Sequence, residues 1–260
     1  SQEPDQQLDS ASTTKLMTAL VSLRLAGEHP EVLAEEVVFS QRADRTRGST
    51  AGLAQGERLT VGECLYGLLL PSGNDASVAL AEHFGDRFSS DKEGRKEQAD
   101  ADDENRNSAN DPLDRFVAEM NRTARSLGMS KTAYRNPHGL TADGHVSTAR
   151  DWTRLAYAAW QLPTLRKYVG TRQFGCTVTG LGGYRRNVVW RNTNRLLKTA
   201  NYHGLKTGTT TKAGACLVST ASRDDEQIFV VVLGATSSDA RYVDSRNLYR
   251  WAWQHILDER

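Results

Sequence analysis

The spacing of apolar residues changes near residue 172, and this change limits the folds that the chain can adopt. Before this point, apolar residues recur three or four positions apart, as in helices with one buried face. Between residues 172 and 234, short alternating runs separated by glycine or polar turns predict strands joined as hairpins. A helical pattern returns at the end of the chain. We therefore expect an α+β fold, with an antiparallel sheet flanked by helices and an all-helical subdomain.

Capping signals set the expected ends of several helices. Thr60 and Glu63 have capping-box spacing, and Pro71 breaks the helix that they open. Ser147 is expected to cap a later helix. The expected helices cover residues 12–26, 60–70, 76–84, 113–127, 147–162 and 239–257, with a helical turn at 194–197. The expected strands cover residues 36–39, 172–179, 184–191, 204–210, 215–221 and 228–234, and loops are expected at 40–58 and 130–146.

Residues 88–112 differ in composition from the rest of the chain. The run from Ser89 to Asp111 has no large apolar residue and is dense in charged residues and asparagine. Such a segment buries too little apolar surface to offset the entropy lost on ordering. We expect a polar surface insertion within a single domain of residues 1–260, whose helical subregion covers about residues 41–162.

Composition excludes several classes of protein. The chain has 260 residues with 33 basic and 32 acidic side chains, a net charge of +1 that gives no general argument for nucleic-acid binding. No apolar run approaches the roughly 20 residues of a membrane helix. The polar, acidic start indicates no signal peptide, so the protein is cytoplasmic or its leader is absent from this chain. The spacing of cysteine and histidine residues matches no metal motif, and we expect neither metal nor cofactor.

Ser12-Thr13-Thr14-Lys15 is the first candidate catalytic motif. A serine and a lysine three positions apart lie on one face of a helix. If Ser12 begins the helix, its hydroxyl lies at the positive end of the helix dipole. A neutral, desolvated Lys15 amine could then accept the serine proton and create a nucleophile without histidine. On these residues alone, an N-cap serine with a solvated lysine is the favoured interpretation, and the catalytic one depends on the rest of the chain.

Two later motifs add to this one. Ser72-Gly73-Asn74 interrupts two helices, where side chains can point into a cleft. Lys206-Thr207-Gly208 lies on an expected strand, whose edge can bind a peptide through main-chain hydrogen bonds. The S-x-N pattern is common, but at random residue usage only about one chain in fifteen of this length would contain K-T-G.

In this order, S-x-x-K, S-x-N and K-T-G resemble the motifs of the penicillin-binding and serine β-lactamase superfamily. Additional segments resemble low-molecular-mass penicillin-binding proteins, the serine-type D-alanyl-D-alanine carboxypeptidases. These segments are N-P-H-G-L from Asn136, S-T-A-R-D from Ser147, N-T-N-R-L-L from Asn192 and G-L-K-T-G from Gly204. The resemblance covers roughly residues 9 to 257, apart from the insertion.

The chain departs from this family in two respects. Only eleven residues precede Ser12, whereas such proteins have more, so we expect the first N-terminal strands of the sheet to be missing. Such proteins often carry a C-terminal β-rich domain and a membrane anchor, and we expect neither in this chain, which ends at Arg260. The family fold, the β-lactamase/transpeptidase-like fold, is otherwise expected to apply.

The resemblance implies roles for individual residues. Ser12 would attack the carbonyl between the two terminal D-alanines of a peptidoglycan stem peptide, Lys15 would be the general base, and Ser72 would relay a proton to the leaving amine. The backbone N–H groups of Ser12 and Thr209 would hold the oxyanion. The expected substrate-binding residues are Asn74, Lys206, Thr207, Gly208, Thr209 and Arg241, of which Thr207, Thr209 and Arg241 would hold the terminal carboxylate.

His138 and Asp151 are expected to hold their loop or helix start rather than to move protons. The implied partners are peptidoglycan stem peptides and, as covalent inhibitors, β-lactams; nucleic acid is not expected, and membrane association is not encoded in this chain. The resemblance places the protein on the extracytoplasmic, periplasmic or cell-wall face. A serine β-lactamase and a β-lactam or peptidoglycan sensor without turnover stay open as alternatives. Against the lactamase, no glutamate occurs from Met120 through Asp225 to serve as a deacylating base.

Overall fold

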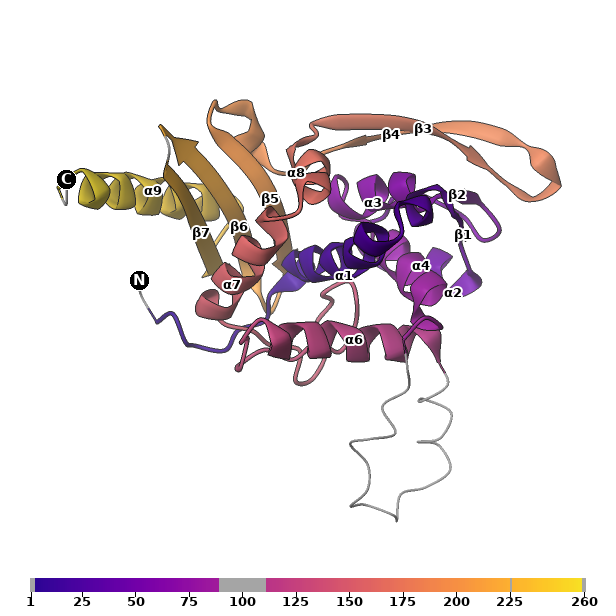
Figure 1. The fold of residues 1–260 in the computed structure, drawn as a ribbon, viewed down its shortest axis with the longest axis horizontal. Helices are drawn as coiled ribbons and strands as arrows, with labels where there is room; N and C mark the ends of the chain where they lie inside the picture. Colours follow the sequence, from indigo (N-terminus) through magenta and orange to yellow (C-terminus); the bar gives the residue numbers. More distant parts are fainter. Residues whose placement is uncertain (1–2, 89–110, 225, 259–260) are drawn as a thin grey trace, which may run out of the picture.

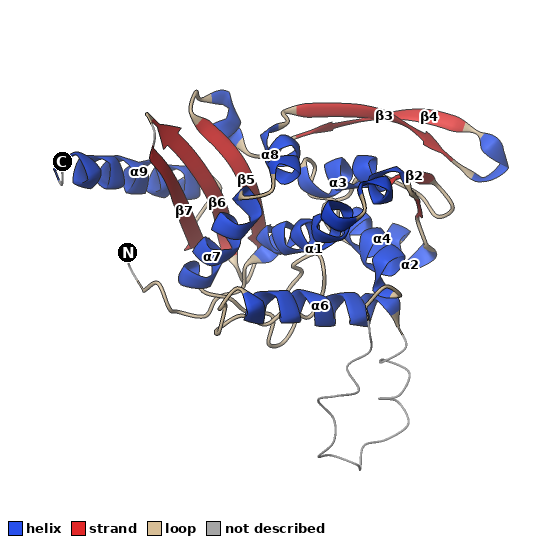
Figure 2. Cartoon of the chain, in the orientation of Figure 1, coloured by secondary structure: helices blue, strands red, loops and turns tan. Residues whose placement is uncertain are grey.

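The computed structural model describes residues 3–88, 111–224 and 226–258 (Figure 1). One sheet joins strands β5, β6 and β7 in that order, all antiparallel. Helix α9 covers one face of this sheet, and helices α1, α7 and α8 pack on the other (Figure 2). The strand bounds are Tyr202–Thr210 for β5, Gly214–Arg223 for β6 and Glu226–Ala235 for β7, and α9 runs over Ala240–Asp258.

A second sheet, in the order β1-β2-β3-β4, extends over the helical part of the molecule (Figure 1). Its longest part is the β3–β4 hairpin. Phe174 of this hairpin stacks on Tyr66, and the indole N–H of Trp190 donates to the carbonyl of Ala51 at 2.8 Å. The bounds are Glu36–Val38 for β1, Arg58–Thr60 for β2, Gln173–Thr179 for β3 and Arg185–Arg191 for β4.

Helix α1, which covers Lys15–Glu28, runs through the centre of the molecule between the three-stranded sheet and the other helices (Figure 1). A 3₁₀ turn, η1 at Ala11–Thr14, leads directly into it. Leu16, Met17 and Leu20 are fully buried, so this helix contributes to the core on several faces. Lys15 is fully buried on this helix, so its amine is removed from bulk water.

The remaining helices surround α1. Both hydrogen bonds of the expected Thr60–Glu63 capping box are present at the start of α3. The α-helices are α2 at Gln41–Asp44, α3 at Val61–Leu69, α4 at Asn74–Gly85, α6 at Pro112–Ser126, α7 at Ala149–Trp160 and α8 at Pro163–Gly170. The 3₁₀ helices besides η1 are η2 at Pro30–Ala34, η3 at Leu181–Gly183 and η4 at Arg195–Lys198.

The α+β architecture is confirmed, but several local expectations are wrong. The strands form two sheets rather than one, because β3 pairs with β2 and β4 and not with β5. Ser12 lies inside a 3₁₀ turn and does not cap α1. Thr148, not Ser147, caps α7, because the Ser147 backbone pairs with Leu8 instead.

Two further segments differ from expectation. Helix α8 was not expected, since it is short and begins at a proline without a capping side chain. The region from 40 to 58, expected to be a loop, contains α2 and reaches into β2. Most of the expected insertion, residues 89–110, lies outside the described residues. None of the described helices is both long enough and apolar enough to cross a bilayer.

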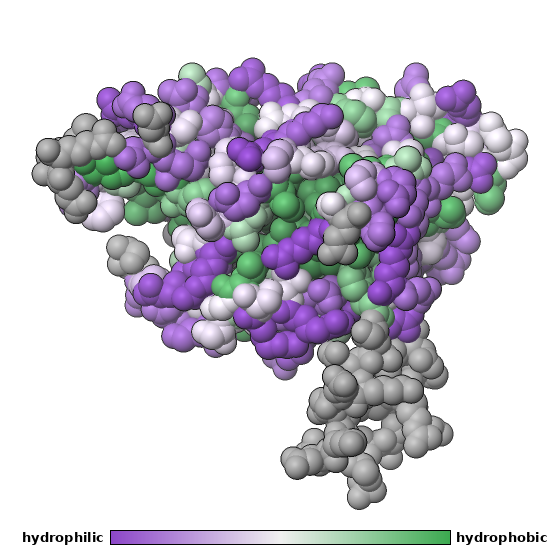
Figure 3. Space-filling model, viewed as in Figure 1, coloured by the Kyte–Doolittle hydropathy of each residue, from purple (hydrophilic) through white to green (hydrophobic). Residues whose placement is uncertain are grey.

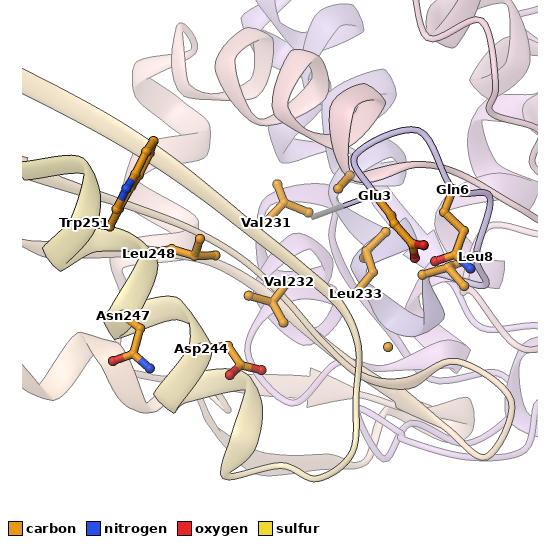
Figure 4. Close-up of a pocket in the computed structure, with 12 residues that line it drawn as sticks. Glu3, Gln6, Leu8, Val231, Val232, Leu233, Asp244, Asn247, Leu248 and Trp251 are labelled. Carbon is orange, nitrogen blue, oxygen red and sulfur yellow. The ribbon is translucent and has the colours of Figure 1, made fainter. Parts of the chain in front are cut away.

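A cavity of about 660 Å³ opens beside β7 (Figure 4). Within the described residues, β7 pairs only with β6, and no strand precedes η1. The cavity lies between β7, the segment before η1 and helix α9, whose Leu248 and Trp251 line it with Val231 and Leu233. It contains none of the expected catalytic residues.

Candidate active site

Strand β5 approaches η1, the turn that contains Ser12, because residue 208 is glycine. A Cβ at this position would lie 2.7 Å from the backbone nitrogen of Ser12 and 2.8 Å from that of Thr13. These separations are too short for any side chain. The absence of a Cβ therefore lets the backbones of β5 and η1 come into contact. Thr209, the next residue of β5, is thereby brought close to η1.

The Lys15 amine lies beside the Ser12 hydroxyl. Its Nζ is 2.9 Å from Ser12 Oγ, 2.6 Å from Asn74 Oδ1 and 2.7 Å from the carbonyl oxygen of His138. Lys15 is fully buried. Burial lowers the pKa of Lys15 well below its usual value, and the nearby charge of Lys206 lowers it further, while Asp75 acts in the opposite direction.

The three contacts match a neutral amine. A neutral lysine has two N–H donors and one lone pair. The Asn74 and His138 oxygens can only accept, so they use both donors. The lone pair is then left for the proton of Ser12, which makes Lys15 a base in position to activate the serine.

The turn between α3 and α4 directs the side chains of Ser72 and Asn74 toward the two buried lysines, Lys206 and Lys15. Ser72 has a φ of 70°, a left-handed conformation that is strained for a residue with a side chain. Its Oγ accepts a hydrogen bond from Lys206 Nζ at 2.9 Å. Asn74 is held by its backbone N–H to Ser49 O at 2.7 Å and by its Nδ2 to Arg47 O at 2.6 Å. The Asn74 amide oxygen is thereby oriented toward Lys15.

Lys206 is buried on β5 and has few partners. Its Nζ donates to Ser72 Oγ and to the Thr207 carbonyl, each at 2.9 Å. Burial lowers the pKa of Lys206 to about 7, with a further contribution from the charge of Arg241. The amine can therefore gain or lose a proton near neutral pH and pass it through Ser72.

Arg241, at the start of α9, is buried rather than a surface arginine. Its Nη1 donates to the Gly208 carbonyl and to Thr209 Oγ1, both at 3.0 Å. Its buried Nε has no hydrogen-bond partner within the described part of the chain. A guanidinium beside the exposed Thr209 can bind an anion such as a carboxylate.

His138 and Asp151 make local contacts. His138 Nδ1 accepts from the Leu140 N–H at 3.1 Å, and burial followed by the Lys15 charge lowers the pKa of His138 to about 3. One oxygen of Asp151 accepts from the Lys131 N–H at 2.9 Å and from Thr132 Oγ1 at 2.8 Å. Each side chain therefore holds a loop in place, and within the described residues neither side chain forms a hydrogen bond with Ser12 or Ser72.

Asp75 supports the site but was not identified from the sequence. This buried carboxylate accepts hydrogen bonds from Thr50 Oγ1 at 2.6 Å and from the Ala51 N–H at 2.8 Å. It thus fixes the loop whose carbonyls hold Asn74. Its position directly after S-x-N was the only available signal.

Thr193 and His145 were also missed. Thr193 Oγ1 lies 2.8 Å from Thr207 Oγ1 on β5. His145 is buried against η1, with its Nε2 3.0 Å from Thr14 Oγ1. Thr193 lies in one of the segments that resemble the carboxypeptidases and His145 lies between two of them, yet only the folded chain brings them to the site. Within the described residues, no group of three or more His, Cys, Asp or Glu side chains could hold a metal ion.

The family model described as D-alanyl-D-alanine carboxypeptidase, Peptidase_S11, matches residues 1–88 and 110–237. The chain belongs to this family. It is therefore a serine peptidase of the low-molecular-mass penicillin-binding proteins, as the motifs predicted.

Individual relatives agree with this assignment. The chain is 32% identical over 252 residues to a D-alanyl-D-alanine carboxypeptidase of Streptomyces sp. strain K15, covering 96% of this chain and 80% of the relative. It is 32% identical over 242 residues to D-alanyl-D-alanine carboxypeptidase DacF of Bacillus subtilis, covering 91% of this chain but only 54% of the relative. The crystal structure of the Streptomyces K15 DD-transpeptidase superposes with a TM-score of 0.82 at 30% identity, covering 96% of this chain and 90% of that one.

Proposed function

We propose that this protein removes the terminal D-alanine from peptidoglycan stem peptides through an acyl-enzyme on Ser12. The observation that carries the proposal is the position of Lys15, whose two N–H donors serve Asn74 and His138 and whose lone pair faces Ser12. Family membership supports the same reaction.

In the acylation step, Ser12 Oγ bonds to the carbonyl carbon of the penultimate D-alanine while Lys15 takes the hydroxyl proton. The oxyanion that forms is stabilised by the backbone N–H groups of Ser12 and Thr209, which the close approach at Gly208 brings to one side of the cleft. The C–N bond then breaks. The leaving amine takes a proton from Ser72, and Lys206 replaces that proton across the 2.9 Å hydrogen bond.

The terminal carboxylate is held by Thr207, Thr209 and Arg241. The guanidinium of Arg241 already contacts Thr209 and has a buried N–H without a partner among the described residues. Asn74 supports the substrate amide. This recognition requires a free carboxylate at the substrate end, which both a stem peptide and a penicillin provide.

Deacylation returns the enzyme to its starting state. Water attacks the ester carbon and gives one proton through Ser72 to Lys206, which replaces the proton that Lys206 lost during acylation. The C–O bond to Ser12 breaks, and Lys15 passes the serine its proton back. Peptidoglycan lies outside the cytoplasm, so we infer that the protein works on the periplasmic or cell-wall face. No contact in the described structure argues for attachment to a membrane.

Penicillin turnover separates this function from a β-lactamase. Glu119 pairs with Arg122 on α6 and bonds Thr123, and Asp143 is exposed, so neither is placed to activate water at Ser12. We expect benzylpenicillin to acylate Ser12 and to leave over minutes or longer. A peptide ending in D-Ala-D-Ala should turn over, because its acyl-enzyme lacks the ring that obstructs water.

Intact mass spectrometry over several hours of penicillin exposure, together with D-alanine release from such a peptide, tests the proposal. Ser12→Ala should abolish both covalent labelling and D-alanine release, whereas Ser130→Ala, at an exposed serine, should preserve both. Undiminished labelling of Ser12→Ala would refute the nucleophile. Many penicillin turnovers per second would identify a lactamase, and a stable adduct without peptide turnover would identify a sensor.

A further inference from the structure

The charge of this chain is unevenly distributed. From Trp152 to Arg223 there are twelve lysine and arginine residues and no aspartate or glutamate, although the whole chain has a net charge of only +1. Acidic partners for these cations must therefore come from other parts of the chain. The structure shows which of them have such partners.

Several of these cations are neutralised or buried. Arg154 pairs with Asp151, Arg186 with Glu57, Arg195 with Asp239 and Lys212 with Asp9, while Lys206 lies inside the active site. Seven others are exposed and form no ion pair with any described residue: Arg223, which ends β6, and six that lie on or beside α8, the β3–β4 hairpin and η4. We call these six the basic surface: Arg166, Lys167, Arg172, Arg185, Arg191 and Lys198.

Strand geometry places three of the arginines on the outward face of the β3–β4 hairpin or at its base. Along β4, Arg185 and Arg191 are exposed, whereas Val188 and Trp190 are buried against the helices. Arg191 is paired in register with Gln173, directly after Arg172. Figure 3 shows hydrophilic residues interspersed with pale and hydrophobic ones along the upper margin of the molecule, where this hairpin lies in Figure 1.

The basic surface adjoins the catalytic cleft. A hollow of about 700 Å³ is lined by Arg191 and by Pro71, the neighbour of Ser72. Thr193, two residues after Arg191, lies 2.8 Å from Thr207 of the K-T-G motif through their hydroxyl oxygens. A second hollow of about 400 Å³ is lined by Arg166 and Arg172. A long ligand could therefore reach from the cleft across the hairpin.

We propose that the basic surface binds the carboxylates of neighbouring stem peptides on a peptidoglycan polymer while one stem occupies the cleft. The inference rests on the proposed function, because it assigns a second contact to the same substrate. A polymer that carries many free carboxylates complements a row of unpaired guanidinium groups. A short soluble peptide cannot reach both places.

The side chains between the arginines favour this partner over an anionic membrane. Gln173, Thr177 and Asn187 share the outward face of the hairpin, and amides and hydroxyls can bond to carboxylates and sugars. Val189 is the one large apolar side chain between Arg185 and Arg191 on that face. A surface that inserts into a bilayer would present several apolar side chains there.

The test compares two triple variants with equal loss of charge. One carries Arg172→Gln, Arg185→Gln and Arg191→Gln. The matched control changes three exposed arginines on α1, α6 and α9 that also lack ion pairs with described residues: Arg24→Gln, Arg125→Gln and Arg246→Gln. D-alanine release is measured from polymeric peptidoglycan and from a soluble D-Ala-D-Ala peptide, at ionic strengths of about 0.01 M and about 1 M.

We expect kcat/KM on the polymer to fall about tenfold at low salt in the hairpin variant, because charged surfaces raise the local substrate concentration. Activity on the soluble peptide should change less than about twofold, the control triple should behave as the unmodified protein, and high salt should remove the difference. Equal losses on both substrates, no loss on the polymer, or an equal loss in the control would each overturn the proposal.

Binding is measured separately with penicillin-acylated protein, whose cleft is blocked. Cosedimentation with peptidoglycan should weaken in the hairpin variant, while a loss of binding to anionic phospholipid vesicles without a loss on peptidoglycan would overturn the proposal. If the unmodified protein releases no D-alanine from the soluble peptide, the proposed function fails. In that case, cosedimentation of unacylated protein with peptidoglycan, compared between the unmodified protein and the hairpin variant, tests the basic surface.

Discussion

Lys206 Nζ lies 2.9 Å from Ser72 Oγ, although the two residues are 134 positions apart. The contact depends on the left-handed backbone conformation of Ser72, which has a φ of 70°. A glycine would adopt this conformation without strain, whereas an alanine would not. Both substitutions remove the hydroxyl that links Lys206 to the leaving amine.

We therefore expect Ser72→Gly to be more stable than Ser72→Ala by about 1 kcal/mol, while both slow acylation by penicillin to a similar extent. Urea unfolding and stopped-flow labelling measure the two quantities. Because each variant removes the same hydrogen bond to Lys206, the stability difference reports the backbone alone. Equal stabilities would show that Ser72 is not strained.

Gly208→Ala should separate β5 from η1, the turn that contains Ser12. The added Cβ would lie 2.7 Å from Ser12 N, so β5 must shift and the oxyanion site must widen. Loss of one oxyanion donor costs about 3–4 kcal/mol in the barrier. Gly175→Ala on β3 is the control, because its nearest atom would be at an ordinary 3.5 Å. Acylation rates for the two variants that differ less than about tenfold would contradict this prediction.

Arg241→Ala should weaken the binding of substrates that have a free terminal carboxylate. A hydrogen bond to a charged group contributes about 1.5–3 kcal/mol, and the loss should appear mainly in KM for a D-Ala-D-Ala peptide. The same peptide with an amidated end provides the control, since it has no carboxylate for Arg241 to bind. An unchanged kcat/KM for the free acid would show that Arg241 binds no carboxylate.

The pH dependence of acylation should have two limbs. Lys15 must be neutral to accept the Ser12 proton, so the rate rises with pH as Lys15 loses its own proton. Lys206 must be charged to protonate Ser72, so the rate falls as Lys206 deprotonates, at a pKa of about 7 in the free protein.

Arg241→Gln identifies the second group. The charge of Arg241 lowers the pKa of Lys206, so its removal should raise that pKa and move the falling limb to higher pH. The second-order rate of fluorescent-penicillin labelling between about pH 4 and pH 10 measures both limbs. A falling limb that stays in place, whatever the overall rate, would mean that another group controls it.

Much of the fold was predictable because helix and strand signals are local. The Thr60–Glu63 capping box and the alternation along β4 depend on residues a few positions apart. Helix α8 lacked such a signal, because it begins at Pro163 without a capping side chain. The division into two sheets could not be predicted, since alternation marks a strand but does not specify its partner.

The sequence by itself determined the chemistry available to this protein: Ser12 and Lys15 one turn apart, a hydroxyl in a helix break, and a glycine where β5 meets η1. Only the tertiary structure decided the protonation of Lys15 and Lys206. Burial lowers both pKa values, the charge of Lys206 lowers that of Lys15 further, and the charge of Arg241 lowers that of Lys206; these groups come from α1, β5 and α9. The unpaired arginines of the basic surface follow the same rule, because a charge is neutralised by what lies near it in space, which sequence position does not specify.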